Sequence, residues 1–580
     1  MSEVLLILMV IVAAAWTLGR YMSVALGDER SRIDRVFAPA EKIIYRVSGI
    51  NASKGMSWQG IAKAFLVSNL VFALIVQAIF MFQHWLPLNP DHIPGMSWDL
   101  ALHTMISFLT NTNQQHYSGQ AQLSYFSQLA GVVTLQVITP AMGFAIALAI
   151  LRGFFGGRNA ATAKEGQTRD LGNFYVDTTK VTLRVFLPLM LSLSLLLTWQ
   201  GVPSTFDAAK HVTPIDAAKH VTPIDAAANV KEQIIPVGPV APMVAIKQLG
   251  TNGGGWYGPN SAVPLENPTP LSNLFQLVSI VLIPMAIVFM MGRFTRRPKL
   301  SLLTFGVMAF FSLAFIGSSL WSESQPNIAA EGLATSQPNM EGKEQRFGAD
   351  SSALWSTLTT QTSNGSVNAM HDSLNPVAGL VAISGMLING IWGGIGCGLV
   401  NFLVYLLVTI FLSGLMIGRS PEIYGRKLEV GEMRLLSVLV LLQPVILLAA
   451  TAVTLSIPSI TGNSNPGFHG VSQVFYEYSS AFANNGSGFE GLGDATKWWN
   501  LSCAVVLLLG RYACFIIPLA VVGRLAMKRV APVTSGTLNI ETPTFAITLI
   551  AVILLLTLLC FLPVLVLGPI GEALSLTASI

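Results

Sequence analysis

Ten long apolar runs alternate with polar connections along this chain. A helix needs roughly 20 residues to cross a hydrocarbon core of about 30 Å. The runs that approach or exceed this length are 4–19, 64–86, 123–151, 181–200, 271–292, 300–321, 377–417, 435–458, 498–527 and 542–568. The pattern predicts an all-α polytopic membrane protein with about ten transmembrane helices.

Short polar turns recur between these runs. They are Phe108–Asn113, Leu249–Gly255, Thr359–Ser366 and Ala481–Ser487, and we align them on Asn113, Asn252, Asn364 and Asn485. Each turn follows a helix-like stretch of about ten residues that is too short to span a membrane. Four unrelated external loops are the alternative, which is more plausible for one turn than for all four.

The turns therefore predict four span-pore-span repeats around a pseudo-fourfold axis, with one extra helix at each end of the chain. The repeats cover about 64–151, 181–292, 300–417 and 435–527. With connecting loops included, we expect the chain to divide into 1–63, 64–151, 152–292, 293–417, 418–527 and 528–580.

Composition agrees with a membrane protein. Of the 580 residues, 52% are hydrophobic and 11% are charged, and the mean hydropathy is +0.60. These values argue strongly against a water-soluble fold. The first run has no basic residues before it, so we expect a permanent helix rather than a cleaved secretory signal.

Basic residues predict the orientation. Eight Lys and Arg residues lie in 20–63, six in 152–184, four in 293–299 and four in 419–434. Because Lys and Arg stay preferentially on the cytoplasmic side, these connections should be cytoplasmic. Both termini and all four polar turns are then external.

The turns have the chemistry of a potassium filter. Backbone carbonyls can replace the water shell of a large monovalent cation, whereas carboxylates suit calcium better. The centres of the turns contain no Asp or Glu; they contain Thr112, Asn113, Thr251, Asn252, Gly253, Gly254, Ser363, Asn364, Gly365, Asn484, Asn485 and Gly486. Gln114 and Gln115 depart from the other turns and are candidates for narrowing the pore or hydrogen-bonding across it.

Two features predict an obstruction beneath these turns. The seventh run holds five glycines in Asn389–Gly398, namely Gly390, Gly393, Gly394, Gly396 and Gly398. They indicate either a flexible barrier or close helix packing through small residues. Arg511 lies within the ninth run and should face protein or water. We call Asn389–Gly398 the glycine break. Arg511 would balance the partial negative charge of the carbonyl oxygens of this break, form a positive barrier to a cation, or make a structural salt bridge.

Other motifs restrict the chemistry. The chain has no phosphate-binding G-x-x-x-x-G-K-[ST] loop, so it should not hydrolyse ATP itself. Its four cysteines, Cys397, Cys503, Cys514 and Cys560, all fall in predicted spans, so we expect apolar packing rather than disulfides or zinc binding. A nonapeptide at 207–215 is repeated at 216–224, which favours a tolerated insertion over a metal site.

Several motifs together resemble one family. They are Leu86–Pro90, Ser97–Ala101, Thr110–Asn113, Tyr117–Gly119, Leu123–Gln128, Leu249–Gly255, Glu266–Thr269, Asn339–Glu344, Arg346–Gly348, Ala369–Ser373, Gly414–Arg419 and Asn484–Ser487. From about residue 55 to the C-terminus the chain is similar to the KdpA family, the potassium-binding subunits of Kdp-type pumps.

The resemblance implies a non-hydrolysing subunit that captures external K⁺ and passes it to a separate P-type ATPase subunit. A small single-span subunit and a peripheral subunit would complete the complex in a bacterial or archaeal plasma (inner) membrane, with lipids as neighbours and no nucleic acid. The resemblance adds Asn111 to the first turn of the filter, sets Gln115 near that turn and puts Arg511 beneath. It further implies that the ion leaves sideways through an internal tunnel because the glycine break blocks the direct route.

This chain also departs from the family pattern. Asn364 stands where the family often has Cys, and Ile388-Asn-Gly390 stands where Gly-Glu usually precedes the glycine break. Two other functions stay open at this point. One is a stand-alone channel or ion-gradient-driven potassium transporter of the same superfamily, and the other is a membrane scaffold with a dead filter.

Overall fold

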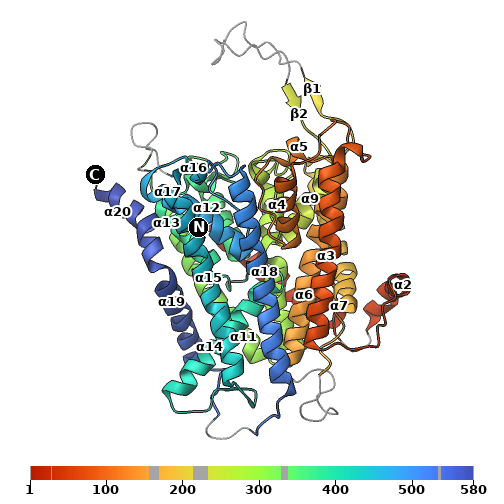
Figure 1. The fold of residues 1–580 in the computed structure, drawn as a ribbon, viewed down its shortest axis with the longest axis vertical. Coiled ribbons are helices and arrows are strands. Elements are labelled where there is room, and N and C mark those ends of the chain that lie inside the picture. The colour runs from red at the N-terminus through yellow and green to blue at the C-terminus, as the bar shows by residue number, and fades with distance from the viewer. Residues whose placement is uncertain are drawn as a thin grey trace.

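The protein is a bundle of long helices crossed by shorter ones that stop halfway (Figure 1). The computed structural model describes residues 2–27, 29, 31–155, 169–212, 233–327, 329, 338–532 and 537–578. Within these residues, ten helices are long and apolar enough to cross a membrane. This confirms the predicted number of spans.

The ten spans are built from the following elements. They are α1 (Ser2–Ala25), α3 (Trp58–Phe82) with η1 (Gln83–Trp85), η2 (Ser127–Val133) with α6 (Thr134–Phe154), α7 (Phe174–Val181) with η3 (Thr182–Phe186) and α8 (Leu187–Trp199), α10 (Pro270–Phe294), α11 (Pro298–Glu323), α14 (Cys397–Met416), α15 (Val430–Ser456), α18 (Lys497–Met527), and α19 (Pro543–Leu565) with η8 (Val566–Ile570) and α20 (Gly571–Ala578).

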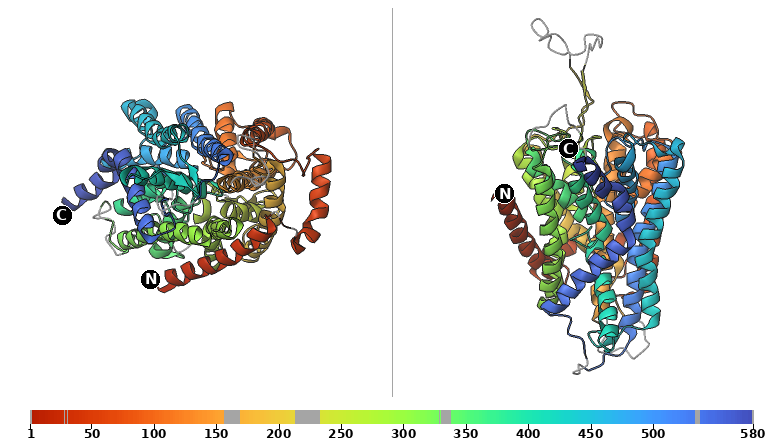
Figure 2. Two further views of the ribbon diagram at one scale, coloured as in Figure 1. Left: turned by 90° about the horizontal axis from the view of Figure 1, so that it is seen from below. Right: turned by 90° about the vertical axis from the view of Figure 1, so that its left-hand side faces the viewer.

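Four short helices precede the polar turns, as the sequence predicts. They are α4 (Trp98–Leu109), α9 (Val240–Leu249), α12 (Gly348–Gln361) and α17 (Gly467–Ala483). Each lies between two spans, which gives the repeats α3-α4-α6, α8-α9-α10, α11-α12-α14 and α15-α17-α18. Seen along the bundle, the chain colours run in order around a centre, from orange through gold and green to blue (Figure 2).

Burial separates an inner set of spans from an outer one. The second span of each repeat is the more buried of the two. In the apolar 18-residue stretch of each second span, the buried share is 83% for η2–α6, 72% for α10, 56% for α14 and 61% for α18. The first spans reach only 22% for α3, 33% for α7–α8, 44% for α11 and 28% for α15. The second spans therefore form the inner wall, and the first spans leave apolar side chains exposed as a lipid-facing surface requires.

The seventh apolar run is two helices rather than one span. α13 (Pro376–Ile388) stops at Asn389, whose φ of 44° is left-handed, and α14 begins only at Cys397. The interruption coincides with the glycine-rich segment, as predicted. The first run also extends further than predicted, to Ala25. At Gly19, α1 packs closely against α10, beside the carbonyl of Ala286.

The remaining elements lie at the two ends of the bundle. Those at the end that carries the polar turns are α5 (Gly119–Gln122), η5 (Asn260–Ala262), η7 (His371–Ser373), α16 (Pro458–Thr461), and the antiparallel pair β1 (Lys210–Val212) and β2 (Gln233–Ile235). At the opposite end, β3 (Glu422–Ile423) pairs with β4 (Arg426–Lys427). The connection expected to be a loop contains α2 (Arg32–Val47), which lies on the outside of the bundle and is joined to η3 by the ion pair between Glu41 and Arg184 (Figure 1).

Both ends of the chain lie at the level of the polar turns (Figure 2). Of the duplicated nonapeptide, 207–212 is described, and Lys210 to Val212 form β1. The remainder, 213–224, lies outside the described residues.

Candidate functional site

The four polar turns share one backbone conformation. In each turn, a residue with left-handed φ is followed two positions later by another: Asn111 and Asn113 at 63° and 57°, Thr251 and Gly253 at 47° and 64°, Ser363 and Gly365 at 51° and 82°, and Asn484 and Gly486 at 53° and 103°. Left-handed φ is costly for residues other than Gly and is found where the surroundings impose it. The same costly pattern in all four turns identifies them as one motif.

This pattern corrects the alignment made from the sequence. Thr112, Asn252, Asn364 and Asn485 are the equivalent central residues, and Asn113 matches Gly253, Gly365 and Gly486. The first turn was shifted by one residue because it has an asparagine where the other three have glycine. Asn can take left-handed φ more easily than other side chains, so the substitution preserves the backbone.

The turns close into a ring. A Cβ atom added at Gly254 would lie 2.9 Å from Cβ of Asn113, so the second turn lies against the first. A side chain on Gly253 would overlap the carbonyl oxygen of Asn364, one on Gly365 that of Asn485, and one on Gly486 that of Thr112. Each turn thus lies against the next, and the last lies against the first.

Asparagine amides tie neighbouring repeats together. Asn111 Nδ2 donates to the carbonyl of Thr251 at 3.0 Å, and Asn113 Nδ2 donates to that of Gly253 at 2.9 Å. Asn364 Nδ2 donates to Lys247 O at 3.0 Å, Asn485 Nδ2 to Thr359 O at 2.8 Å and Asn484 Nδ2 to Thr112 Oγ1 at 3.0 Å. Asn252 is buried against Asn111. These side chains are occupied in holding the ring.

Gln115 lies beyond the ring rather than beneath it. Its side chain makes a reciprocal pair with Gly255, accepting from the backbone N–H at 2.6 Å and donating to the carbonyl at 3.0 Å. The sequence analysis placed Gln115 near the first turn, as a candidate for narrowing the pore or hydrogen-bonding across it. In the structure it joins the first two turns on the side where the chain leaves them.

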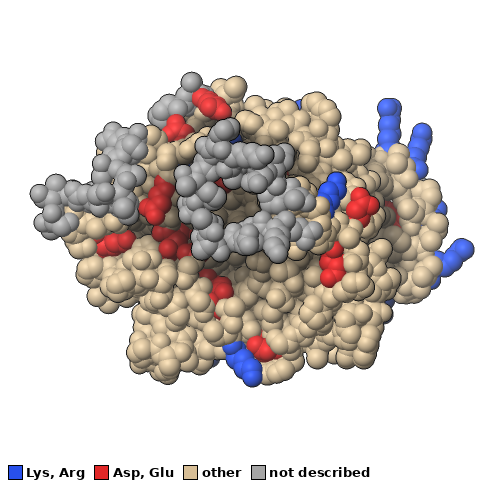
Figure 3. Space-filling view, turned by 90° about the horizontal axis from the view of Figure 1, so that it is seen from above, with Lys and Arg blue, Asp and Glu red and all other residues tan. Residues whose placement is uncertain are grey.

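The electrostatics of the ring suit a cation. All four short helices end at the turns, so the partly negative carbonyl ends of α4, α9, α12 and α17 face the same region. Around the middle of the upper face, acidic side chains are visible, whereas most visible Lys and Arg lie toward its edges (Figure 3).

The glycine break lies directly against the second and third turns. The backbone N–H of Ile395 donates to Thr251 Oγ1 at 3.0 Å, and Ser363 Oγ donates to Asn389 Oδ1 at 3.1 Å. Gly393 N–H donates to the carbonyl of Gln361 at 2.8 Å. The break therefore crosses beneath the ring.

The break is also tightly packed. A side chain on Gly396 would overlap the carbonyl of Gly143 on α6, and one on Gly398 would overlap Trp392 and Gly393. A side chain on Gly394 would have Ser363 as its nearest neighbour, 3.4 Å from its Cβ. Of the two interpretations made from the sequence, these contacts favour close packing through small residues, and the barrier stays a prediction.

Arg511 on α18 lies beside the break. Its side chain is buried, its Nη2 donates to the carbonyl of Thr139 at 3.3 Å, and its guanidinium stands 4.7 Å over the ring of Phe515. A Cβ atom added at Gly143 would lie 2.9 Å from the carbonyl oxygen of Ile395 and 3.1 Å from Arg511 Nη2. The arginine and the break therefore both pack against Gly143. The salt bridge considered from the sequence has no acidic partner among the residues that the structure describes.

A small cavity opens to the side of the break. It has a volume of about 60 Å³ and is lined by residues of the break, α14, α15, α18 and α19, including Asn389, Asn401, Tyr405, Gln443 and Cys514. Asn401 Nδ2 donates to the carbonyl of Asn389 at 2.9 Å. The cavity therefore lies beside the break, between α14, α15, α18 and α19.

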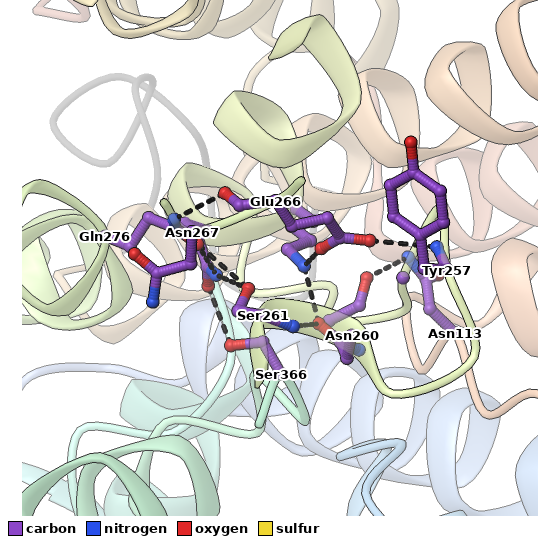
Figure 4. A network of polar contacts seen from close by, with 12 residues as sticks. Asn113, Tyr257, Asn260, Ser261, Glu266, Asn267, Gln276 and Ser366 are labelled. Atoms are coloured by element: carbon purple, nitrogen blue, oxygen red, sulfur yellow. Dashed lines mark hydrogen bonds and ion pairs between the residues drawn. The ribbon is translucent and has the colours of Figure 1, made fainter. Parts of the chain in front are cut away.

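Sequence reasoning missed a buried polar network behind the second and third turns (Figure 4). Lys247 on α9 is paired with Glu266 and donates to Asn260, and all three are buried. Glu266 also accepts from the N–H of Tyr257 at 3.0 Å, and its carbonyl accepts from Gln276. A lysine in a short apolar helix was the signal in the sequence, because a buried charge needs a partner.

The same network reaches the third turn. Gln248 Nε2 donates to Gln276 Oε1 at 3.0 Å, and Ser366 Oγ donates to Gln248 Oε1 at 2.8 Å. Lys247 itself accepts hydrogen bonds at its carbonyl from Asn252, Gly253 and Asn364. The ion pair therefore anchors the pore helix at the place where two turns meet.

Comparison with known proteins gives extensive matches. The sequence profile of the family described as potassium-transporting ATPase A subunit matches residues 5–574. The potassium-transporting ATPase potassium-binding subunit of Gloeobacter violaceus is 44% identical over 571 residues, which are 98% of this chain and 97% of that protein. The protein of the same name from Pseudomonas aeruginosa is 44% identical over 581 residues, 99% of each chain.

A solved structure is similar at a greater distance. The potassium transporter TrkH from Vibrio parahaemolyticus matches with a TM-score of 0.49 and 15% identity, covering 88% of this chain and 95% of that one.

Proposed function

The chain belongs to the potassium-transporting ATPase A subunit family, and we propose that it selects external K⁺ in its ring of four turns and passes the ion sideways to a separate P-type ATPase subunit. It is a potassium-binding transporter subunit with multiple membrane spans. The filter, the route beyond it and the partner that receives the ion are the proposal.

One observation carries the filter. The paired left-handed residues recur in all four turns, and each turn lies against the next in a closed ring. Alternating left-handed residues turn successive carbonyls toward one side of the chain, and four such chains around an axis offer a cage of oxygens to a dehydrated cation. The proposed ligands are backbone carbonyls of residues 111–113, 251–254, 363–365 and 484–486.

The sideways exit is supported by what lies below the ring. The glycine break crosses beneath the second and third turns, and the buried charge of Arg511 stands next to it. A cation moving straight down would approach a buried positive charge, which is unfavourable in a medium of low dielectric constant. The cavity beside Asn389 and Asn401 is the open alternative.

The proposed partners supply the functions that this chain is not proposed to have. In the proposed complex, a separate subunit hydrolyses ATP through an aspartyl phosphate, with a small single-span subunit and a peripheral subunit alongside. We place the ring and both termini on the outer side of a bacterial or archaeal plasma membrane, because the basic connections lie at the opposite end of the bundle.

The test compares the assembled complex with the chain alone. K⁺ should stimulate ATP hydrolysis in the complex, while vesicles containing this chain alone should neither hydrolyse ATP nor pass K⁺ at channel rates. Rapid K⁺ flux through the chain alone would overturn the proposal in favour of a stand-alone channel. Absence of K⁺ binding to both preparations would favour a scaffold with a dead filter.

A further inference from the structure

A cluster of three metal-ligating side chains is buried behind the first and fourth turns. His116 follows the first turn, Glu477 lies on α17 and Cys503 on α18, and all three are buried. One potential ligand atom from each residue lies within 4.8 Å of the other two. These residues are far apart in the sequence, and only the fold brings them together.

The hydrogen bonds fix which nitrogen of His116 carries the proton. Asn500 Nδ2 donates to the carboxylate of Asp99 at 2.9 Å, which turns Asn500 Oδ1 toward His116 Nδ1 at 2.8 Å. Because Oδ1 is only an acceptor, Nδ1 must be the protonated nitrogen. In the neutral ring, Nε2 then carries a lone pair.

That lone pair points toward another acceptor. His116 Nε2 is buried without a hydrogen-bond partner and lies 3.5 Å from Glu477 Oε1. Gln114 donates to the same carboxylate oxygen. Two acceptors facing each other in a buried site are unfavourable unless a proton or a metal cation lies between them.

The surroundings are also negative. The carboxylates of Asp494 and Glu477 both interact electrostatically with His116. The same electric field would attract a metal cation. Asp494 belongs to the loop that follows the fourth turn, so it approaches the cluster from a different element.

We propose that His116 Nε2, the Glu477 carboxylate and Cys503 Sγ form a binding site for one transition-metal cation of the Zn²⁺ class. Imidazole, carboxylate and thiolate are the ligand types of zinc sites, and tetrahedral ligands of zinc stand roughly 3.4 Å apart. The separation of 3.5 Å between His116 Nε2 and Glu477 Oε1 fits this spacing. Nδ1–H on Asn500 supplies the second hydrogen bond that orients a metal-bound histidine.

Charge balance favours a divalent ion here. On binding, the Cys503 thiol loses its proton to solvent, so the site holds one thiolate, one carboxylate and one divalent cation and is neutral overall. The fourth coordination position remains open. This assignment changes the role of Cys503, which the sequence treated as an apolar packing residue.

Access would come from the outer side. Gly488 belongs to the loop after the fourth turn, and a Cβ atom added there would lie 2.8 Å from Glu477 Oε2. Glycine at this position therefore leaves room beside the carboxylate. The metal would enter under this loop.

Two measurements on the full-length purified protein test the site. After equilibration with Zn²⁺ and removal of excess metal, elemental analysis should find one equivalent retained. With Co²⁺ in place of Zn²⁺, a thiolate-to-cobalt absorption band should appear. Cys503→Ala should abolish the band and weaken Zn²⁺ retention at least about tenfold. Cys514→Ala, which removes another buried cysteine of the same helix, should keep both signals.

Clear outcomes would overturn the proposal. Wild-type protein that retains no Zn²⁺ and gives no cobalt band would show that His116 and Glu477 instead share a proton. Wild-type retention that persists in Cys503→Ala would place the metal elsewhere. If Cys503→Ala does not fold, Cys503→Ser takes its place as the test variant, and the cobalt band should again be lost.

Discussion

Gly486 of the fourth turn lies so close to the carbonyl oxygen of Thr112 in the first turn that any side chain at 486 would overlap that oxygen. The contact joins the two ends of a motif that is otherwise arranged in sequence order. It closes the ring, so each turn has another turn on both sides. A defect in one turn should therefore affect the binding of the ion by the others.

Gly486→Ala should lower the apparent K⁺ affinity of the assembled complex by at least about tenfold, equivalent to about 1.4 kcal/mol. The methyl group displaces the Thr112 carbonyl, and φ of 103° at position 486 disfavours any side chain. The K⁺ concentration that gives half-maximal ATPase activity measures the effect. Gly317→Ala on α11 is the matched control, because a side chain there meets nothing within 4 Å. Equal half-maximal concentrations in the two variants would contradict the ring.

Gly253→Asp is a more severe version of the same experiment. Its side chain would overlap the carbonyl of Asn364 and bring a carboxylate into a ring that has none. We expect the K⁺ dependence of the ATPase to be lost or shifted by more than in Gly486→Ala. Unchanged K⁺ affinity would favour the scaffold function.

Much of this architecture could be predicted because its signals are local. Apolar length gives the spans, the glycines of Asn389–Gly398 give the break, and short helices before polar turns give the repeats. The register of the first turn could not be predicted, because what the turns share is a pair of φ angles and not a residue type. Asn113 satisfies the angle without being glycine.

The polar contacts behind the turns were also beyond sequence reasoning. Lys247 pairs with Glu266 across a loop, and His116 meets Glu477 and Cys503 across three elements. Which partners meet depends on how the repeats pack around the axis, and spacing along the chain does not contain that information. The sequence shows that Arg511 is a charge within a membrane span. It does not show that Arg511 has no acidic partner in the described part of the chain, because that depends on how the helices pack.

The Lys247–Glu266 pair should be essential as a pair. Both side chains are fully buried, so removing one partner leaves an isolated charge and should cost roughly 3–5 kcal/mol. Lys247→Met and Glu266→Gln should each lower the thermal unfolding midpoint sharply, while the double variant should recover part of the loss. Arg296→Ala, which breaks an exposed pair with Glu29, should leave the midpoint almost unchanged. Additive effects of the two single variants would contradict this coupling.

His469 should make the attachment of α20 depend on pH. Its Nε2 lies 2.9 Å from Asp372 Oδ1, and its Nδ1 lies 2.8 Å from Glu572 Oε1 on α20. Burial lowers the pKa of His469, but the two carboxylates outweigh burial and raise its pKa from 6.5 to about 10. Because the folded protein holds this proton more tightly, the stabilisation is complete below about pH 6.5 and is lost as pH rises toward 10.

Thermal unfolding of the purified protein between pH 6 and 10 measures this effect. The midpoint of wild-type protein should fall with pH over this window more steeply than that of His469→Gln, which cannot carry the charge. Parallel curves for the two proteins would show that the charge of His469 contributes nothing to stability.

Arg511→Gln should allow K⁺ to leak through the assembled complex in the absence of ATP. Glutamine is polar but shorter than arginine, and it removes the positive charge beside the Ile395 carbonyl of the break. With that charge gone, the carbonyls of the break present a cation with a more favourable downward path, because a buried charge in a low-dielectric site acts strongly over a few ångströms. Vesicles containing the complex should then show ATP-independent K⁺ efflux, while Arg511→Lys, which keeps the charge, should remain tight. If vesicles with the Arg511→Gln complex show no more K⁺ efflux than wild-type vesicles, while their ATPase still responds to K⁺, the barrier is formed by the backbone of the break alone.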